Sequence, residues 1–193
     1  MVRHNSTSRI SLSDVVEAAT EILEQYGLAD LSMRRVATRL GVQPSALYWH
    51  VRDKQSLLAL VADRLLDGVV FSAPLPEWRA ELRARAVTLH GALLSTRDAA
   101  ELVASVVALD IGGQRFRALI AEPVPRSLTG LNYRENAGGD IVADTLVDGV
   151  CSLLLGHAVI SQQRAQAIEF EAGGTSPRPI AEFSAMLDLL LVG

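Results

Sequence analysis

Apolar residues recur at helical spacing along most of this 193-residue chain. The first clear stripe contains Val15, Ala19, Ile22 and Tyr26. These positions follow i, i+4, i+7 and i+11, which places them on one face of a helix. We expect this helix to begin at Asp14, with Ser13 as its N-cap, and to end before Gly27. The strict alternation that marks strands is nearly absent from the chain, so the pattern predicts an all-α fold.

Three further helices follow closely on the first. Ser32 is a suitable N-cap for a short helix that Gly41 ends after Leu40. Pro44 then opens a helix of about two turns over residues 44–50, because proline is well suited to the first helical position. Asp53 is the expected N-cap of a longer fourth helix, which we expect to run from Lys54 to about Phe71.

A proline-containing segment, residues 72–76, is the best boundary in the chain. Beyond it, helical patterns extend over about 77–95, 98–109, 112–121, 140–164 and 179–191. A stretch rich in proline and glycine separates the third of these helices from the fourth, and residues 171–178 are expected to form a loop. The pattern predicts an N-terminal domain over residues 1–53 and a C-terminal helical domain over residues 54–193. The fourth helix would link the two domains.

The segment 32–50 has the form of a helix-turn-helix. Two short helices that cross steeply need a residue with positive φ at the turn, and Gly41 stands there. Inward-facing apolar positions are provided by Val36, Leu40, Leu47 and Val51. The outward face of the second helix is then formed by Gln43, Pro44, Ser45, Tyr48 and Trp49. A helix in this position enters the major groove of DNA with its N-terminal residues at the base edges.

The distribution of charge supports contact with a polyanion. The whole chain has a formal net charge of −4, yet residues 31–54 contain five basic residues against one acidic residue. We expect Gln43 and Ser45 to meet base edges, although Gln43 could instead only cap its helix. Arg34 could reach a base or a phosphate. Phosphate contacts are expected from Tyr48, His50, Lys54 and the backbone N–H groups that begin the fourth helix.

Residues 9–66 closely resemble the DNA-binding domain of the TetR family of bacterial regulators, near the tetracycline-repressor subfamily. The resemblance is carried by Leu31-Ser32-Met33-Arg34-Arg35-Val36-Ala37, by Leu40-Gly41-Val42 and by Leu47-Tyr48-Trp49-His50-Val51-Arg52-Asp53-Lys54. It implies an all-α homodimer that represses transcription from a palindromic operator and leaves it when a small molecule enters the C-terminal domain. It also implies that Arg34, Gln43, Tyr48, Trp49, His50 and Lys54 lie at or near DNA. The subfamily has Gln-Pro-Thr where this chain has Pro44-Ser45-Ala46, so we expect a different operator.

The resemblance fades in the C-terminal domain. Alignment through Trp78 and Arg97-Asp98 puts four residues at drug- and metal-binding positions of the subfamily, and none of them matches: Arg85, Leu89, Val103 and Val106. We therefore expect neither tetracycline nor a bound metal, and no cofactor. The domain is mainly apolar, which favours a small hydrophobic or aromatic effector held by a few polar groups. The predicted ligand contacts are His90, Val103, Val106, Phe116, Arg117 and His157; further polar candidates are Asp110, Gln114, Asn132, Tyr133 and Gln162.

The helices expected at 140–164 and 179–191 are more apolar than surface helices usually are. In the resembling family, two such helices from each subunit build a four-helix interface, which predicts a two-fold homodimer. The predicted interface residues are Leu146, Val150, Leu154, Phe183, Leu187 and Leu190. On the same helix, Asp140, Asp144 and Asp148 recur every four residues, and we interpret them as a solvated stripe rather than a metal cluster.

Other classes of protein are less well supported. The single Cys151 excludes an internal disulfide framework, no uninterrupted apolar stretch is long enough to span a bilayer, and no signal peptide is indicated, so we expect a cytoplasmic protein. No catalytic constellation stands out, so an enzyme is not expected. The main alternative is a transcriptional activator, or a regulator without a small-molecule effector; a helical protein-interaction module is a further possibility.

Overall fold

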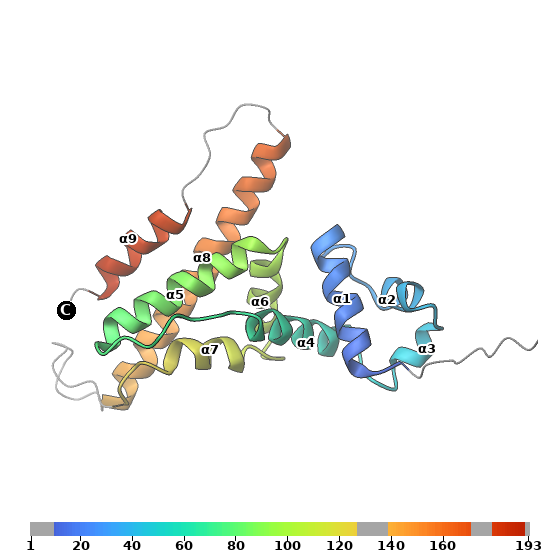
Figure 1. The fold of residues 1–193 in the computed structure, drawn as a ribbon, viewed down its shortest axis with the longest axis horizontal. Coiled ribbons are helices and arrows are strands. Elements are labelled where there is room, and N and C mark those ends of the chain that lie inside the picture. The colour runs from blue at the N-terminus through green and yellow to red at the C-terminus, as the bar shows by residue number, and fades with distance from the viewer. Residues whose placement is uncertain (1–9, 127–138, 171–178, 192–193) are drawn as a thin grey trace, which may run out of the picture.

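The computed structural model describes residues 10–126, 139–170 and 179–191, and these residues form helices joined by turns and loops, without a strand (Figure 1). The helices are α1 (Leu12–Tyr26), α2 (Met33–Leu40), α3 (Pro44–Leu47), α4 (Lys54–Asp67), α5 (Trp78–Ser95), α6 (Ala99–Ala108), α7 (Gln114–Ala121), α8 (Gly139–Phe170) and α9 (Pro179–Leu191). The predicted all-α fold is thus confirmed. The predictions for residues 171–178 and for Asn132 and Tyr133 concern residues outside the described ranges.

Helix ends follow local capping chemistry. Ser32 accepts a hydrogen bond from the Arg35 backbone N–H, and Gly41 ends α2 in the left-handed conformation at φ 67°, as predicted. Asp53 caps α4 by accepting the Ser56 N–H at 2.7 Å. The start of α1 was predicted wrongly: Ser11, not Ser13, is the N-cap. Ser11 and the Asp14 side chain satisfy each other's backbone N–H groups in a capping box, which fixes the start at Leu12.

Two predicted helices are shorter in the structure. α3 ends at Leu47, because the carbonyl of Leu47 accepts both the His50 and the Val51 N–H at 2.9 Å and so closes the chain into a turn. α4 ends at Asp67, just before Gly68, and not near Phe71. Residues 48–50 therefore lie in a turn between α3 and α4.

α4 links the two ends of the molecule. In Figure 1 it runs from the group α1–α3 into the group α5–α9, and it packs against α1 on one side and against α6 and α7 on the other. The buried apolar side chains form one continuous cluster that includes Val15 and Ile22 of α1, Leu57 and Val61 of α4, and Leu102 of α6. A shift of α4 must therefore disturb packing at both ends.

A second connection joins the two groups. Asp98, in the turn between α5 and α6, accepts the backbone N–H of Leu28 at 2.9 Å and the side-chain amide of Gln166 on α8 at 2.6 Å. A Cβ atom at Gly27 would lie 2.5 Å from the Asp98 carboxylate, so the approach is close. The turn after α1 is thus tied to both α8 and the start of α6.

α8 contains a segment, Val142–Ile168, that is long and apolar enough by length and composition to cross a membrane. The sequence prediction considered only uninterrupted apolar stretches, and charged residues such as Asp144 and Asp148 interrupt this segment. In the structure α8 packs against α5, α6, α7 and α9. Apolar composition on several sides is what such a central helix requires.

Candidate DNA interface and ligand domain

The outer face of the helix-turn-helix is polar and aromatic. Leu47 is fully buried and anchors α3, while Gln43 and Ser45 at the start of that helix are exposed. In the following turn Tyr48 is 56% exposed and Trp49 is 90% exposed. A large indole side chain that faces solvent gains the free energy of apolar burial only when a partner covers it. The face is therefore suited to contact with another molecule.

Gln43 stands at the N-cap position of α3, but its side chain makes no capping hydrogen bond. The alternative in which Gln43 only caps its helix is not supported by this geometry. Pro44 occupies the first helical position, where its missing N–H costs nothing, and it is half-buried. The amide of Gln43 keeps its donors and its acceptor for an external partner.

The basic residues of this region differ in their pairing. Arg35 pairs with Asp30, Arg39 binds Glu21 with Nε–Oε2 at 2.6 Å, and Arg52 binds the carboxylate of Asp53 at 3.0 Å. In contrast, the structure gives no ion pair for the exposed Arg34 and Lys54 with any residue it describes. Carboxylates of α1 and of the α1–α2 turn thus neutralise part of the positive charge that the sequence shows in this region. The positive charge that has no ion pair with a described residue is that of Arg34 and Lys54.

The predicted backbone anion site at the start of α4 is partly occupied. The carboxylate of Asp53 accepts the backbone N–H and the hydroxyl of Ser56, both at 2.7 Å, and these bonds hold the pKa of Asp53 below its usual range. Lys54 remains exposed beside this carboxylate. His50 is half-buried, and its electrostatic influence reaches Asp14 at the start of α1. The sequence predicted Asp53 as the cap of α4, but not that its carboxylate would already occupy donors at the expected anion site.

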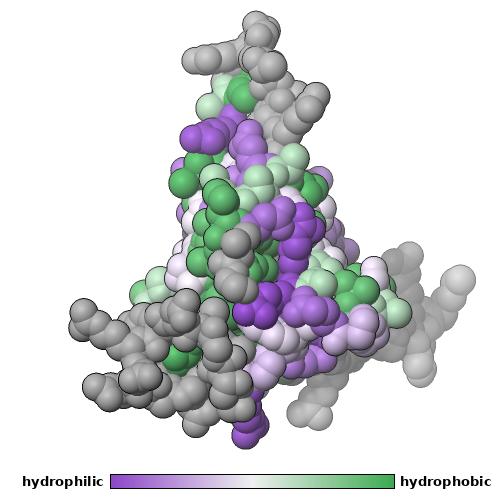
Figure 2. All heavy atoms as spheres, turned by 90° about the vertical axis from the view of Figure 1, so that its left-hand side faces the viewer, coloured by the Kyte–Doolittle hydropathy of each residue, from purple (hydrophilic) through white to green (hydrophobic). Residues whose placement is uncertain are grey.

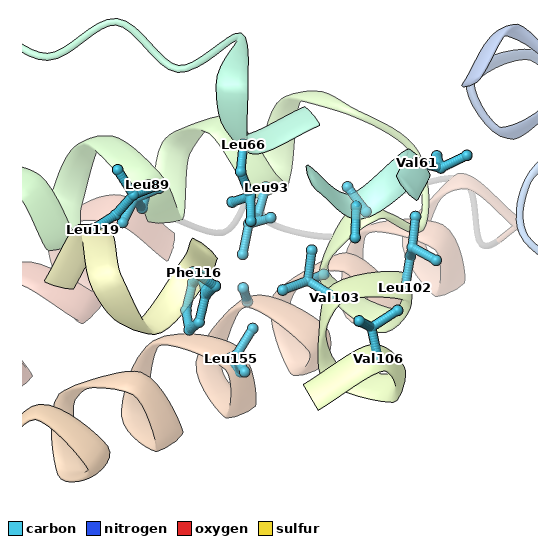
Figure 3. Packing of buried hydrophobic residues seen from close by; sticks show 14 of the residues in the cluster. Val61, Leu66, Leu89, Leu93, Leu102, Val103, Val106, Phe116, Leu119 and Leu155 are labelled. Carbon is cyan, nitrogen blue, oxygen red and sulfur yellow. The ribbon is translucent and has the colours of Figure 1, made fainter. Parts of the chain in front are cut away.

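The predicted ligand contacts do not converge on one cavity. Val103, Val106 and Phe116 are at most 1% exposed and are packed among side chains of α4, α5, α7 and α8, as Figure 3 shows. The prediction of Val103 and Val106 as ligand contacts is corrected here: both are fully enclosed core residues and line none of the cavities described below.

His90 and His157 do come together, but as a packed cluster. Their ring nitrogens, His90 Nε2 and His157 Nδ1, lie 2.9 Å apart, and the His90 ring stacks on Phe183 at a centroid distance of 4.3 Å. His90 is completely buried, and its Nδ1 has no hydrogen-bond partner. Burial lowers the pKa of His90 to about 4, and the neighbouring His157 adds to this shift. The pair joins α5, α8 and α9, and neither histidine lines the cavities next to Arg117.

Two surface cavities flank Arg117. The larger, of about 660 Å³, lies between α7 and the N-terminal part of α8. The smaller, of about 300 Å³, lies between the α6–α7 turn and α8, and its lining includes Asp110, Gln114 and Phe116. Arg117 itself binds Asp144 at 2.7 Å and Asp148 at 2.8 Å. These aspartates therefore hold an arginine and are not the purely solvated stripe that the sequence suggested. Gln162, another polar candidate, instead joins α8 to Leu93, Thr96 and Ala100.

Sequence analysis missed a buried ionic network behind the larger cavity. Arg85 on α5 is 8% exposed and binds Glu81 through Nε at 2.6 Å. Its other two nitrogens bind the carboxylate of Glu122, just after α7, at 2.7 and 2.8 Å. The i, i+4 spacing of Glu81 and Arg85 was the only signal in the sequence, and it is equally typical of a surface pair.

Four predicted dimer-interface residues belong to the core of the single chain. Val150, Leu154, Phe183 and Leu187 have no exposed surface, so their assignment to a subunit interface is wrong. The apolar stripes that carry them are used to dock α8 and α9 onto α5 and onto each other. Of the six predicted residues, only Leu146, which is half-buried, and Leu190, which is 44% exposed, reach the surface.

The outer sides of α8 and α9 nevertheless expose apolar groups. Leu146 and Leu190 line a shallow apolar cavity of about 330 Å³ with Val142, Thr145 and Gly149. Ile160, Ile180, Met186 and Leu189 are between 43% and 81% exposed. Figure 2, which views the molecule from the end opposite to α1–α3, shows apolar side chains at the surface beside polar ones.

An all-helical chain that presents the exposed face of a helix-turn-helix, with unpaired cations beside it, is a DNA-binding transcriptional regulator of the helix-turn-helix class. Residues 15–61 match the family described as "Bacterial regulatory proteins, tetR family". The similarity to one full-length relative extends over most of the chain. The chain belongs to the tetR family.

The relatives are repressors and DNA-binding proteins. The class A tetracycline repressor from transposon 1721 of Escherichia coli is 32% identical over 171 residues, which cover 87% of this chain and 74% of that protein. The class E repressor of Escherichia coli is 39% identical over 98 residues, and this match spans only 49% of this chain and 46% of that protein. Among solved structures, Mycobacterium smegmatis BioQ has a TM-score of 0.80 at 32% identity, covering 94% of this chain and 96% of that one. BioQ with its double-stranded DNA operator has a TM-score of 0.74 at 30% identity, over 95% and 99% of the two chains.

Proposed function

We propose that this protein is a cytoplasmic, ligand-responsive transcriptional repressor that binds an inverted-repeat operator as a homodimer. Residues 1–53 would form the DNA-binding domain, and residues 54–193 the ligand-binding and dimerisation domain. The observation that carries the proposal is the exposed face of Gln43, Ser45, Tyr48 and Trp49, flanked by the unpaired Arg34 and Lys54. The crystal structure of the related BioQ with its operator supports the same use of the fold. The eight predicted DNA contacts, including Pro44 and His50, remain part of this proposal.

In our proposal, an effector would act through α4. Gly112 in the α6–α7 turn touches this helix: a Cβ atom at Gly112 would lie 3.2 Å from the Cβ of Ala59 and 2.7 Å from a methyl group of Val106. Gly112 does not have positive φ, so glycine is required there by the close approach and not by the backbone conformation. A displacement of the turn would be transferred directly to α4 and so to the DNA-binding helices.

Dimerisation would use the outer sides of α8 and α9. Gly149 and Gly156 lie one heptad apart on α8, and a Cβ atom at either position would meet nothing within 4 Å. Such open, small positions allow a helix of a second copy to approach closely. The exposed Leu190 and the half-buried Leu146 line one cavity with Gly149. A two-fold arrangement would place two recognition helices on successive half-sites, about 34–36 Å apart.

A regulator without a small-molecule effector is the second candidate, and the packed interior favours it. Val103, Val106 and Phe116 fill the centre of the C-terminal helices. Because these side chains fill the interior, an effector would have to bind in one of the surface cavities beside Arg117.

Selection of DNA by the purified protein tests the proposal. Genomic fragments of the source DNA are retained by the protein at about 0.15 M salt and sequenced. We expect enrichment of a few fragments that share an inverted repeat, with an affinity that falls steeply as salt increases. Retention without sequence preference would contradict a sequence-specific repressor. No retention at any salt concentration would contradict the assignment of the exposed face to DNA.

A further inference from the structure

The buried Arg85 is held by two carboxylates that differ in accessibility. Glu81, on the same helix, has a side chain 8% exposed and is fixed by a further hydrogen bond from the backbone N–H of Leu75 at 2.8 Å. Glu122 has a side chain 62% exposed, although it makes the bidentate contact with Nη1 and Nη2. Glu81 is thus a fixed partner, whereas Glu122 reaches Arg85 from the solvent side.

Arg85 needs a carboxylate in this position. Without Glu122 the guanidinium keeps its pair with Glu81 through Nε, but its Nη1 and Nη2 donors lose their carboxylate acceptors, which is unfavourable in a buried site. Its planar donors fit a carboxylate in bidentate geometry, and the Phe71 ring lies 5.1 Å from the guanidinium carbon. A carboxylate with the same bidentate geometry can therefore take the place of Glu122 on these two nitrogens.

The 660 Å³ cavity lies on the accessible side of this contact. Glu122 and Leu119 belong to its lining, and the carbonyl oxygen of Leu119 lies 3.5 Å from Nη1 of Arg85. The apolar part of the lining includes Leu119, Val124, Ala143 and Val147. Arg115, Arg117 and Arg126 lie at the same cavity against two carboxylates, Glu122 and Asp144. Arg126 has no ion pair with any residue in the described ranges.

We propose that the effector is an amphipathic carboxylate, whose acid group replaces Glu122 on Arg85 and whose apolar body occupies the cavity between α7 and α8. This inference rests on the proposed function, because it names the chemical class of the effector. A cavity of this volume lies within the range that small-molecule sites usually have. Arg126, which has no ion pair with a described residue, adds positive charge at the cavity, and the apolar lining accommodates the hydrocarbon part of the ligand.

The exchange is connected to the DNA-binding helices. Glu122 directly follows α7, so its release removes a constraint on the end of that helix. On the same helix Arg115 binds Asp67 of α4, with Nε–Oδ1 at 3.1 Å. A ligand that detaches Glu122 thereby changes the position of a helix that is tied to the link between the two domains.

Calorimetry on the full-length protein with three matched probes tests the chemistry: 4-phenylbutyrate, 4-phenylbutylamine and 4-phenylbutan-1-ol. All three share one apolar body and differ only in the polar end. We expect the carboxylate to bind at least tenfold more tightly than the amine or the alcohol. Equal binding of the three probes, or preference for the amine, would overturn the proposal.

Two variants locate the site. Glu122→Gln weakens the internal competitor but leaves the Glu81–Arg85 pair, so it should bind 4-phenylbutyrate at least threefold more tightly than the wild type. Arg85→Gln should lose this binding. The control, Arg83→Gln, lies on the same helix but pairs with Asp188, and it should bind like the wild type. Circular dichroism of each variant checks folding. Unchanged or weaker binding by a folded Glu122→Gln would contradict the exchange, even if Arg85→Gln does not fold.

These measurements are made without DNA and therefore do not depend on operator binding. A protein that binds 4-phenylbutyrate as expected but retains no genomic fragment would contradict the repressor function and leave the anion site intact. A protein that binds its operator but shows no preference for the carboxylate would contradict the anion site alone.

Discussion

Arg34 and Arg39 lie on the same short helix, but their surroundings give them different roles. Arg39 is held by Glu21 of α1, whereas Arg34 has no carboxylate partner in the described residues. An arginine whose charge is already neutralised by a carboxylate attracts a phosphate less strongly than an unpaired arginine does. The sequence pattern does not distinguish the two residues. The packing of α1 against α2 distinguishes them, because it brings Glu21 to Arg39 and not to Arg34.

Replacement of Arg34 by alanine should therefore weaken operator binding more than replacement of Arg39. We expect a loss of roughly tenfold for Arg34→Ala, because a charge-assisted contact contributes about 1.5 kcal/mol. If the contact is to phosphate, the slope of log K against log salt should decrease by about one, while sequence preference is kept. Fluorescence anisotropy with labelled operator at several salt concentrations measures both quantities. Equal losses for Arg34→Ala and Arg39→Ala would contradict this distinction.

His90 predicts a pH dependence of stability. Its pKa is about 4 in the folded protein, against 6.5 for an unperturbed histidine, because burial disfavours the charged ring. Above pH 6.5 both folded and unfolded chains hold this histidine neutral, so its contribution is fully present. As pH falls from 6.5 towards 4, the unfolded chain binds the proton first, and the free energy of unfolding falls by up to about 1.4 kcal/mol per pH unit.

The variant His90→Phe should remove this part of the pH dependence, since phenylalanine can stack on Phe183 but binds no proton. Urea unfolding at pH 7, 6 and 5 measures the effect. His157, whose pKa is also lowered by burial, loses its ring-nitrogen partner in this variant, so the comparison is repeated with His157→Gln in both proteins. The same slope in wild type and variant would show that His90 does not contribute.

The turn between α6 and α7 depends on residues with left-handed backbone conformations. Asp110 there has a left-handed backbone with φ of 52°, and Gly113 has φ of 89°. These residues fold the chain so that Gly112 lies against Ala59 of α4. The turn is thus shaped by backbone conformation and closely fitted to the linking helix.

Gly112→Ala should displace this contact and imitate an effector. The new Cβ atom would lie 2.7 Å from a Val106 methyl group of α6 and 3.2 Å from the Cβ of Ala59 on α4, so the turn must move relative to both helices. We expect operator affinity to fall at least tenfold, whereas the melting temperature falls by only a few degrees, because overpacking costs about 1–3 kcal/mol. The control Gly91→Ala adds a Cβ atom 3.9 Å from its nearest neighbour, Ile180, and should bind operator normally. Wild-type affinity in a folded Gly112→Ala would contradict transmission through this turn.

The whole molecule is an elongated arrangement in which α1–α3 lie at one end and α9 at the other (Figure 1). Its continuous core passes through α4, so the two ends are mechanically connected. Apolar groups remain at the surface on α8 and α9, far from the exposed face of the helix-turn-helix. A second copy docked there would leave both DNA-binding faces accessible.

Leu190→Asp should convert the dimer into a monomer. Leu190 is 44% exposed and lines the apolar cavity with Leu146, so a charge there would be buried without a partner in a dimer, at a cost of several kcal/mol. Light scattering should give half the wild-type mass, and operator affinity should fall with it. Val70→Asp is the control, because Val70 is 86% exposed and lies between α4 and α5. A dimeric mass for Leu190→Asp would place the interface elsewhere.

Features that depend only on neighbouring residues could be predicted from the sequence. The all-α fold, Ser32 and Asp53 as N-caps, Gly41 as the end of α2 and the outward face of α3 all follow from local capping chemistry and helical period. Such features are encoded within a few residues, and periodicity reports which side of a helix is apolar.

The packing partner of each apolar helix face could be seen only in the tertiary structure. The stripe with Leu154 and Leu187 is typical of both an interface and a core, and packing against α5 assigned it to the core. The pairing of Arg39 with Glu21, the contact of Gly112 with Ala59 and the pair of Arg85 and Glu122 join residues that are far apart in the chain. Helical period carries no information about such contacts, because they depend on how whole helices are placed against one another.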